Sequence, residues 1–131
     1  MSVLDTSAAV DFLLGQEVSD AVEEVLQGDQ EAAAPDLLVF EVLAVLRRHA
    51  AQGVIPSERA EAAVADLGDL PIELFPTMPL RGRAWELREN ITAGDAMFVA
   101  LAERIGAPLV TKDRGLARAA RRHAGIEVVE L

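Results

Sequence analysis

Near its N-terminus the chain contains the segment Val3-Leu4-Asp5-Thr6-Ser7, in which two apolar residues are followed by three polar ones. The apolar pair predicts a short buried strand, and the polar residues are typical of the N-terminal cap of a helix, which we expect over residues 8–14. Similar units recur along the chain. A short strand that runs directly into a helix is the repeating unit of parallel sheets, so this segment indicates the α/β class.

Strands and helices are predicted to alternate along the rest of the chain. The expected strands span residues 31–34, 72–75, 109–110 and 127–129, and the expected helices span residues 18–27, 35–51, 57–69, 79–89, 95–105 and 114–124. This pattern favours a short parallel sheet with helices on both faces. No internal repeat, low-complexity tract or linker interrupts it, so we expect residues 1–131 to form a single domain.

The composition narrows the possible chemistry. Cysteine is absent, which excludes a disulfide framework, a thiolate zinc site and a cysteine nucleophile. No basic segment followed by an apolar run opens the chain, and no apolar stretch approaches the roughly 18 residues that cross a bilayer. We therefore expect a cytoplasmic protein without a membrane partner.

The formal net charge of −10 is unevenly distributed. Residues 1–45 contain ten acidic residues and no Lys or Arg, whereas residues 46–131 contain twelve acidic and twelve basic residues. Phosphate contacts usually come from Lys and Arg. Because the excess of acidic residues is confined to residues 1–45, the negative net charge does not exclude a nucleic-acid partner. Arginine suits bidentate phosphate contacts, although a solvated helix face explains each single one equally well. Four arginines gather near the C-terminus, namely Arg114, Arg118, Arg121 and Arg122.

Two aspartates directly follow predicted strands. Asp5 follows the first strand, and Asp113 follows the strand at residues 109–110. In open α/β sheets ligands bind beyond the carboxyl ends of the strands, so we expect both side chains at one edge of the sheet. Each could instead simply cap the helix that comes after it.

Two further acids lie in apolar helical segments. Glu41 is the only ionisable residue of residues 37–46, so its helix is expected to leave it little solvent-facing surface. A buried carboxylate needs a cation, a hydrogen-bonding partner or a metal, and a salt bridge to a core-facing arginine is the alternative to a site. Asp95 opens an almost entirely apolar helix, where an N-terminal cap is the alternative.

If these four acids gather, they repel one another unless a cation lies among them. A site with only oxygen ligands favours magnesium or manganese over zinc, and such an ion can activate water and neutralise charge on a phosphate. Ser7 and Thr111 each lie two residues from an aspartate, so their hydroxyls are expected to orient a carboxylate or a water. The sequence thus predicts a site of Asp5, Glu41, Asp95 and Asp113.

Four segments together resemble a known family. They are Val3-Leu4-Asp5-Thr6-Ser7-Ala8, Phe40-Glu41-Val42-Leu43 with Arg47-Arg48, Gly94-Asp95-Ala96-Met97-Phe98-Val99-Ala100-Leu101-Ala102, and Leu109-Val110-Thr111-Lys112-Asp113 with Leu116-Ala117. In this order and at about these spacings they resemble the PIN-domain nucleases, and within them the VapC-type toxins of toxin–antitoxin pairs. Two positions depart from the family. Gly94 replaces a common Tyr, and Leu116-Ala117 leave no further acid near Asp113.

The resemblance implies a three-layer α/β/α sandwich and an endoribonuclease that depends on magnesium or manganese. It also implies tRNA or ribosomal RNA as substrate, a homodimer, and an antitoxin partner whose C-terminal segment blocks the site and which supplies the contact with DNA. Two alternatives stay open at this point. One is an inert PIN-like module that binds RNA or protein, and the other is a phosphohydrolase or phosphoacceptor domain with Asp5 as nucleophile.

Overall fold

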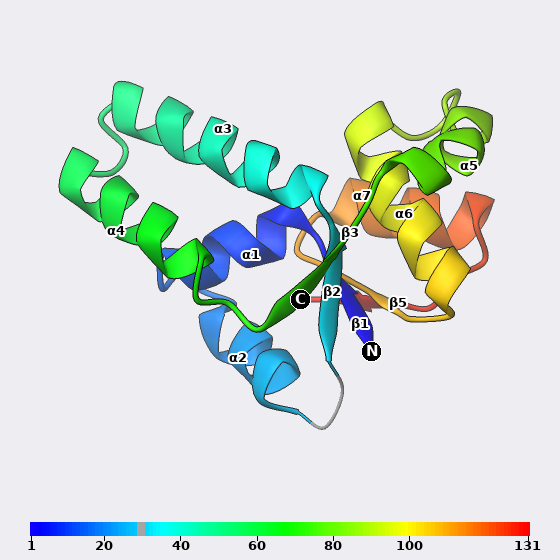
Figure 1. The fold of residues 1–131 in the computed structure, drawn as a ribbon, viewed down its shortest axis with the longest axis horizontal. Helices are drawn as coiled ribbons and strands as arrows, with labels where there is room; N and C mark the ends of the chain where they lie inside the picture. The colour runs from blue at the N-terminus through cyan, green and yellow to red at the C-terminus, as the bar shows by residue number, and fades with distance from the viewer. Residues whose placement is uncertain (29–30) are drawn as a thin grey trace.

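Five parallel strands form the centre of the protein in a computed structural model, which describes residues 1–28 and 31–131 (Figure 1). The strands are β1 (Ser2–Leu4), β2 (Ala32–Pro35), β3 (Ile72–Phe75), β4 (Leu109–Thr111) and β5 (Val128–Glu130). They pair in the order β3-β2-β1-β4-β5. Every residue of the three central strands is buried, as expected for parallel strands covered on both faces.

Helices cover the sheet from both sides. They are α1 (Thr6–Leu13), α2 (Ser19–Gln27), α3 (Leu37–Ala51), α4 (Ser57–Leu67), α5 (Arg81–Glu86), α6 (Ala93–Ile105) and α7 (Arg114–His123), with a short 3₁₀ helix at Met78–Leu80 before α5. Figure 1 shows α1 to α4 on one side of the strands and α5 to α7 on the other. The predicted three-layer α/β/α sandwich with a short parallel sheet is therefore confirmed.

Small side chains let the layers approach closely. The buried residues of β2 are mainly alanines, and α6, which packs on β1 and β2, buries an almost continuous apolar run. A helix that is apolar nearly all round is stable only in such a position, between the sheet and another layer of helices. Helix α5 supplies part of that outer layer.

Several element boundaries differ from the predicted ones by one to three residues, and two of these differences bear on the sheet edge. Pro35 ends β2 rather than beginning α3, because the Asp36 N–H donates to Phe75 O (2.8 Å) and continues the pairing with β3 for one more residue. A residue before proline also favours extended backbone, which suits Ala34 in the strand. Helix α6 begins at Ala93 rather than at Asp95, so Asp95 lies within its first turn.

One ion pair with a buried carboxylate was not predicted from the sequence. Asp11 on α1 is only 2% exposed, and its Oδ1 lies 2.8 Å from the Lys112 ammonium group, which is more exposed. Asp11 Oδ2 accepts the Val18 N–H (2.7 Å). Burial of a carboxylate is tolerated only with such partners, so the pair fastens α1 and the start of α2 to the segment after β4.

Replacement of Asp11 by alanine should destabilise the protein by about 1–3 kcal/mol, because the Val18 N–H and the Lys112 ammonium group lose their shared buried acceptor. Chemical denaturation of Asp11→Ala measures the loss. The matched control is Glu61→Ala, since Glu61 is exposed on α4. Equal stability of Asp11→Ala and wild type would show that the pair does not fasten these elements.

Among the described residues, no helix combines the length and the apolar character needed to span a membrane.

Candidate functional site

The helices that follow β1 and β4 lie on opposite faces of the sheet. The chain leaves β1 into α1 on one face of the sheet and leaves β4 into α7 on the other face (Figure 1). The two strands are neighbours, and the Asp5 N–H donates to Val110 O (3.1 Å). Such a reversal opens a crevice beyond the carboxyl ends of the strands, where open α/β sheets bind their ligands. Asp5 and Asp113 both follow these strands.

Asp5 is held rigidly at this crevice. Its side chain is 3% exposed and caps α1 by accepting the Ala8 N–H at Oδ1 (3.0 Å). The Ser7 hydroxyl donates to the same carboxylate (2.8 Å to Oδ1), and the Thr111 hydroxyl donates to Oδ2 (2.5 Å). Three donors fill three of the roughly four lone-pair positions of a carboxylate. One position of Asp5 is left for another ligand.

Backbone amides fix the direction in which these hydroxyls donate. Ser7 Oγ accepts the Lys112 N–H (3.1 Å), and Thr111 Oγ1 accepts the Asp113 N–H (3.0 Å). Because each hydroxyl oxygen already accepts a hydrogen bond, its own hydrogen is free to point at Asp5. The expected orienting contacts of Ser7 and Thr111 are thus present in the structure, and both act on Asp5.

Glu41 faces the same region from α3. Its Oε1 accepts the Thr6 hydroxyl (2.8 Å), one residue after Asp5. A Cβ atom added to Gly94 would lie 2.7 Å from Glu41 Oε2, so the glycine leaves room for this carboxylate. In the described part of the chain no ion pair joins Glu41 to an arginine. The salt-bridge alternative for Glu41 is therefore not seen.

Asp95 and Asp113 complete the set from α6 and α7. Asp95 is half-buried in the first turn of α6, and Asp113 is exposed and caps α7 through its Oδ1, which accepts the Leu116 N–H (3.0 Å). Asp113 therefore does cap the helix that follows it, which was the alternative to a role in a site. Capping occupies only part of a carboxylate, so it is compatible with a second role.

The carboxylates influence one another electrostatically. Burial raises the pKa of Asp95, and the charges of Asp113 and Glu41 raise it further, against a hydrogen bond from Thr92 that lowers it. Burial likewise raises the pKa of Asp5, with a smaller contribution from Asp95, although the donors of its network oppose the shift. All four acids therefore belong to one region of negative charge.

A divalent cation suits this region chemically. The side chains that converge on it offer only oxygen atoms, and their mutual repulsion is what a cation would relieve. Within residues 1–28 and 31–131, however, no three acidic or histidine side chains already lie in an arrangement that could hold a metal ion. Coordination by these four residues therefore requires rotation of side chains, for which the exposed Asp113 and the half-buried Glu41 have freedom.

One expectation about side-chain surroundings is wrong. Helix α3 does present a solvent-facing side, where Phe40 is 67% exposed, although Glu41 is half-buried as expected. Trp85 on α5 is also 67% exposed, and the Arg88 guanidinium lies 4.6 Å from the centre of its ring. Apolar residues on helices at the surface give no sequence signal that separates burial from exposure.

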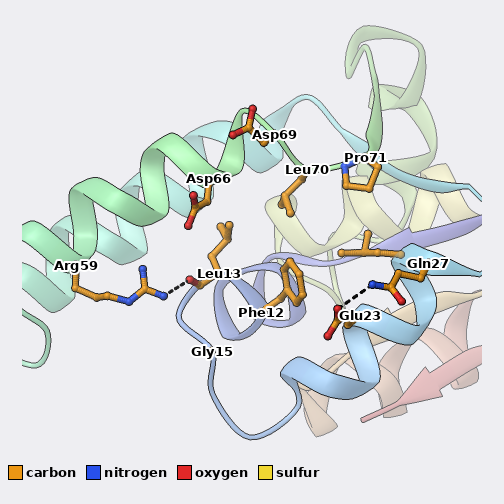
Figure 2. Close-up of a pocket in the computed structure, with 11 residues that line it drawn as sticks. Phe12, Leu13, Gly15, Glu23, Gln27, Arg59, Asp66, Asp69, Leu70 and Pro71 are labelled. Carbon is orange, nitrogen blue, oxygen red and sulfur yellow. Dashed lines mark hydrogen bonds between the residues drawn. The ribbon is translucent and has the colours of Figure 1, made fainter.

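A cavity of about 520 Å³ lies elsewhere, between α1, α2 and α4. Figure 2 shows Arg59 beside it, with its guanidinium donating to Leu13 O (2.5 Å), and shows Gln27 donating to Glu23. Its lining contains none of the four acids at the sheet edge. The cavity is therefore separate from the carboxylate site.

Comparison with known proteins agrees with this geometry. The sequence pattern of the PIN domain matches residues 2–122. Ribonuclease VapC12 of Mycobacterium tuberculosis is 36% identical over 129 residues, which cover 98% of this chain and 99% of that protein. Ribonuclease VapC1 of the same species is 40% identical over 118 residues, covering 89% of each.

Solved structures share the fold. VapBC2 from Rickettsia felis, bound to a DNA fragment from its promoter, matches 98% of this chain and 97% of its own with a TM-score of 0.72 and 16% identity. VapBC-5 from M. tuberculosis matches 99% and 98% with a TM-score of 0.64 and 21% identity. From the matched sequence pattern and the identity to the two ribonucleases, the chain belongs to the PIN domain family and, within it, to the VapC group.

Proposed function

We propose that this protein is a metal-dependent endoribonuclease that acts as the toxin of a toxin–antitoxin pair. One observation carries the proposal: Asp5 and Asp113 directly follow the neighbouring strands β1 and β4, and Glu41 of α3 accepts the hydroxyl of Thr6 beside Asp5. The names of the relatives support RNA as the substrate class. Because RNA is the proposed target, we place the activity in the cytoplasm, with tRNA or ribosomal RNA as the expected substrates.

The four carboxylates would hold magnesium or manganese. When bound, such an ion lowers the pKa of a water molecule and neutralises charge that develops on the phosphate. We assign Asp5 and Asp95 as the inner ligands, since Asp5 is buried and Asp95 is half-buried in the first turn of α6. Ser7 and Thr111 keep the Asp5 carboxylate in one orientation, which leaves its remaining lone pair fixed in direction.

The partners follow from the relatives as proposals. The VapBC structures contain an antitoxin with the toxin, and one of them contains promoter DNA. We propose a cognate antitoxin for this chain, with DNA contacted only through it. Val39, Phe40 and Leu43 form an exposed apolar surface on α3, which supports a homodimer.

An inert PIN-like module that binds RNA or protein is the second candidate. It is favoured by the absence, in the part of the chain that the structure describes, of side chains already grouped closely enough to hold a metal ion. Such a module would bind neither magnesium nor manganese at the sheet edge, and it would leave RNA intact.

The variant Asp5→Asn should cleave RNA roughly 100-fold more slowly than wild type, or slower still. The lost carboxylate charge weakens stabilisation of the transition state by a few kcal/mol, which corresponds to that factor. The measurement is cleavage of total tRNA with magnesium or manganese by purified protein. Asp36→Asn is the matched control, since Asp36 also follows a strand, β2, at this sheet edge but is exposed. Equal cleavage by Asp5→Asn and wild type would refute the assignment, and no cleavage by wild type would favour the inert module.

The variant Asp95→Asn should melt a few degrees higher than wild type when metal is absent and the pH is neutral. A carboxyl whose pKa is raised by folding binds its proton more tightly in the folded state, so it favours folding at low pH and loses this effect as the pH rises through the raised pKa. Asparagine mimics the protonated form, so the difference should shrink as the pH is lowered.

Thermal melts with and without manganese measure this effect. Manganese should stabilise wild type and should not stabilise Asp95→Asn, because only the ligated folded state gains free energy from binding. Asp66→Asn, on the exposed side of α4, is the control and should behave as wild type. A lower melting temperature of metal-free Asp95→Asn would contradict the predicted repulsion.

A further inference from the structure

Most basic side chains of the described residues already have a partner. Arg83 and Arg121 pair with acids, Lys112 pairs with Asp11, and four further arginines either donate to carbonyl oxygens or stack on Trp85. In residues 1–28 and 31–131, the side chains of five arginines have neither a hydrogen bond nor an ion pair. They are Arg47 and Arg48 on α3, and Arg114, Arg118 and Arg122 on α7.

The three on α7, hereafter the α7 arginine row, lie on one side of the helix. They are spaced at i and i+4, so they neighbour one another, while the opposite side of α7 is buried through Leu116, Ala117 and Ala120. The row spans about 12 Å at 1.5 Å per residue. A hollow of about 370 Å³ lies along it, lined by the row together with Arg121 and Glu130.

Helix stability does not explain the whole row. Cations in the last turn interact favourably with the helix dipole, which accounts for Arg122. Arg114 lies at the first residue of α7, where the dipole disfavours a cation, and like charges four residues apart are mildly destabilising. Residues 114–123 of α7 include no acid; Asp113 lies at its N-cap beside Arg114, and Glu130 pairs with Arg121 rather than with the row. A ligand with several negative charges would relieve this repulsion.

The position of the row indicates which polyanion it fits. The row begins one residue after Asp113, the acid that caps α7 at the sheet edge, and runs away from it. Several charges spread over this length match successive phosphates of a nucleic acid rather than a single phosphate ion. We propose that the α7 arginine row binds the sugar–phosphate backbone of the RNA on one side of the cleaved bond. This proposal rests on the proposed ribonuclease function.

The test uses the full-length Asp5→Asn protein with magnesium, so that RNA is bound without being cut, and total tRNA as the probe. Arg118→Gln/Arg122→Gln should raise the Kd about tenfold and should lower the slope of log K against log salt by about 1.5, as two phosphate contacts are lost. Arg47→Gln/Arg48→Gln is the matched control, since it removes two equally unpartnered and exposed charges from α3. Arg118→Lys/Arg122→Lys should keep most of the affinity and the slope, because it keeps the charge.

In the otherwise wild-type enzyme, Arg118→Gln/Arg122→Gln should raise KM for tRNA with kcat nearly unchanged. The proposal is overturned if the α7 and α3 double variants bind tRNA with the same Kd and salt slope. It is also overturned if the α7 variant loses binding only to anionic lipid vesicles. Failure of the ribonuclease function is distinct, because wild type would then cut no tRNA whatever the binding data show.

Discussion

Repulsion among carboxylates at the carboxyl edge of the sheet is the constraint on which the other features of this protein depend. Asp5 is buried and Asp95 is half-buried, and burial together with the charges of the neighbouring acids raises the pKa of Asp95. A fold that only needed stability would replace these groups with apolar or neutral ones. Keeping these acids in one region is favourable if a cation binds there. The cation removes the repulsion that destabilises the metal-free protein, and this free energy then contributes to metal binding.

The rest of the fold holds these charges in place against that repulsion. Parallel strands β1 and β4 set the spacing of the segments that follow them, and hydrogen bonds from Ser7 and Thr111 keep the Asp5 carboxylate from turning away. The buried pair of Asp11 and Lys112 fastens α1 to the segment after β4. Beyond the acids, the α7 arginine row offers positive charge that would draw a polyanion toward a chain of net charge −10.

Much of this arrangement could be predicted from the sequence, because local pattern and strand direction decide it. Acids that follow strands of a parallel sheet must share an edge, which placed Asp5 and Asp113. The contacts that could not be predicted join segments distant in the chain. The partnership of Asp11 with Lys112 has no local signal, and neither has the exposure of Trp85, since an apolar or charged residue on an amphipathic helix is compatible with several surroundings. Pro35 was misplaced because its strand pairing overrides its preference for a first helical turn.

The most direct measurement is a crystal structure of the protein grown with manganese, in which anomalous scattering locates the ion. The account predicts manganese at the carboxyl edge of the sheet, ligated by Asp5 and Asp95, with Glu41 turned from the Thr6 hydroxyl toward the ion and Asp113 beside it. Manganese bound elsewhere, or a sheet edge that stays free of metal while the Thr6–Glu41 hydrogen bond persists, would contradict the account.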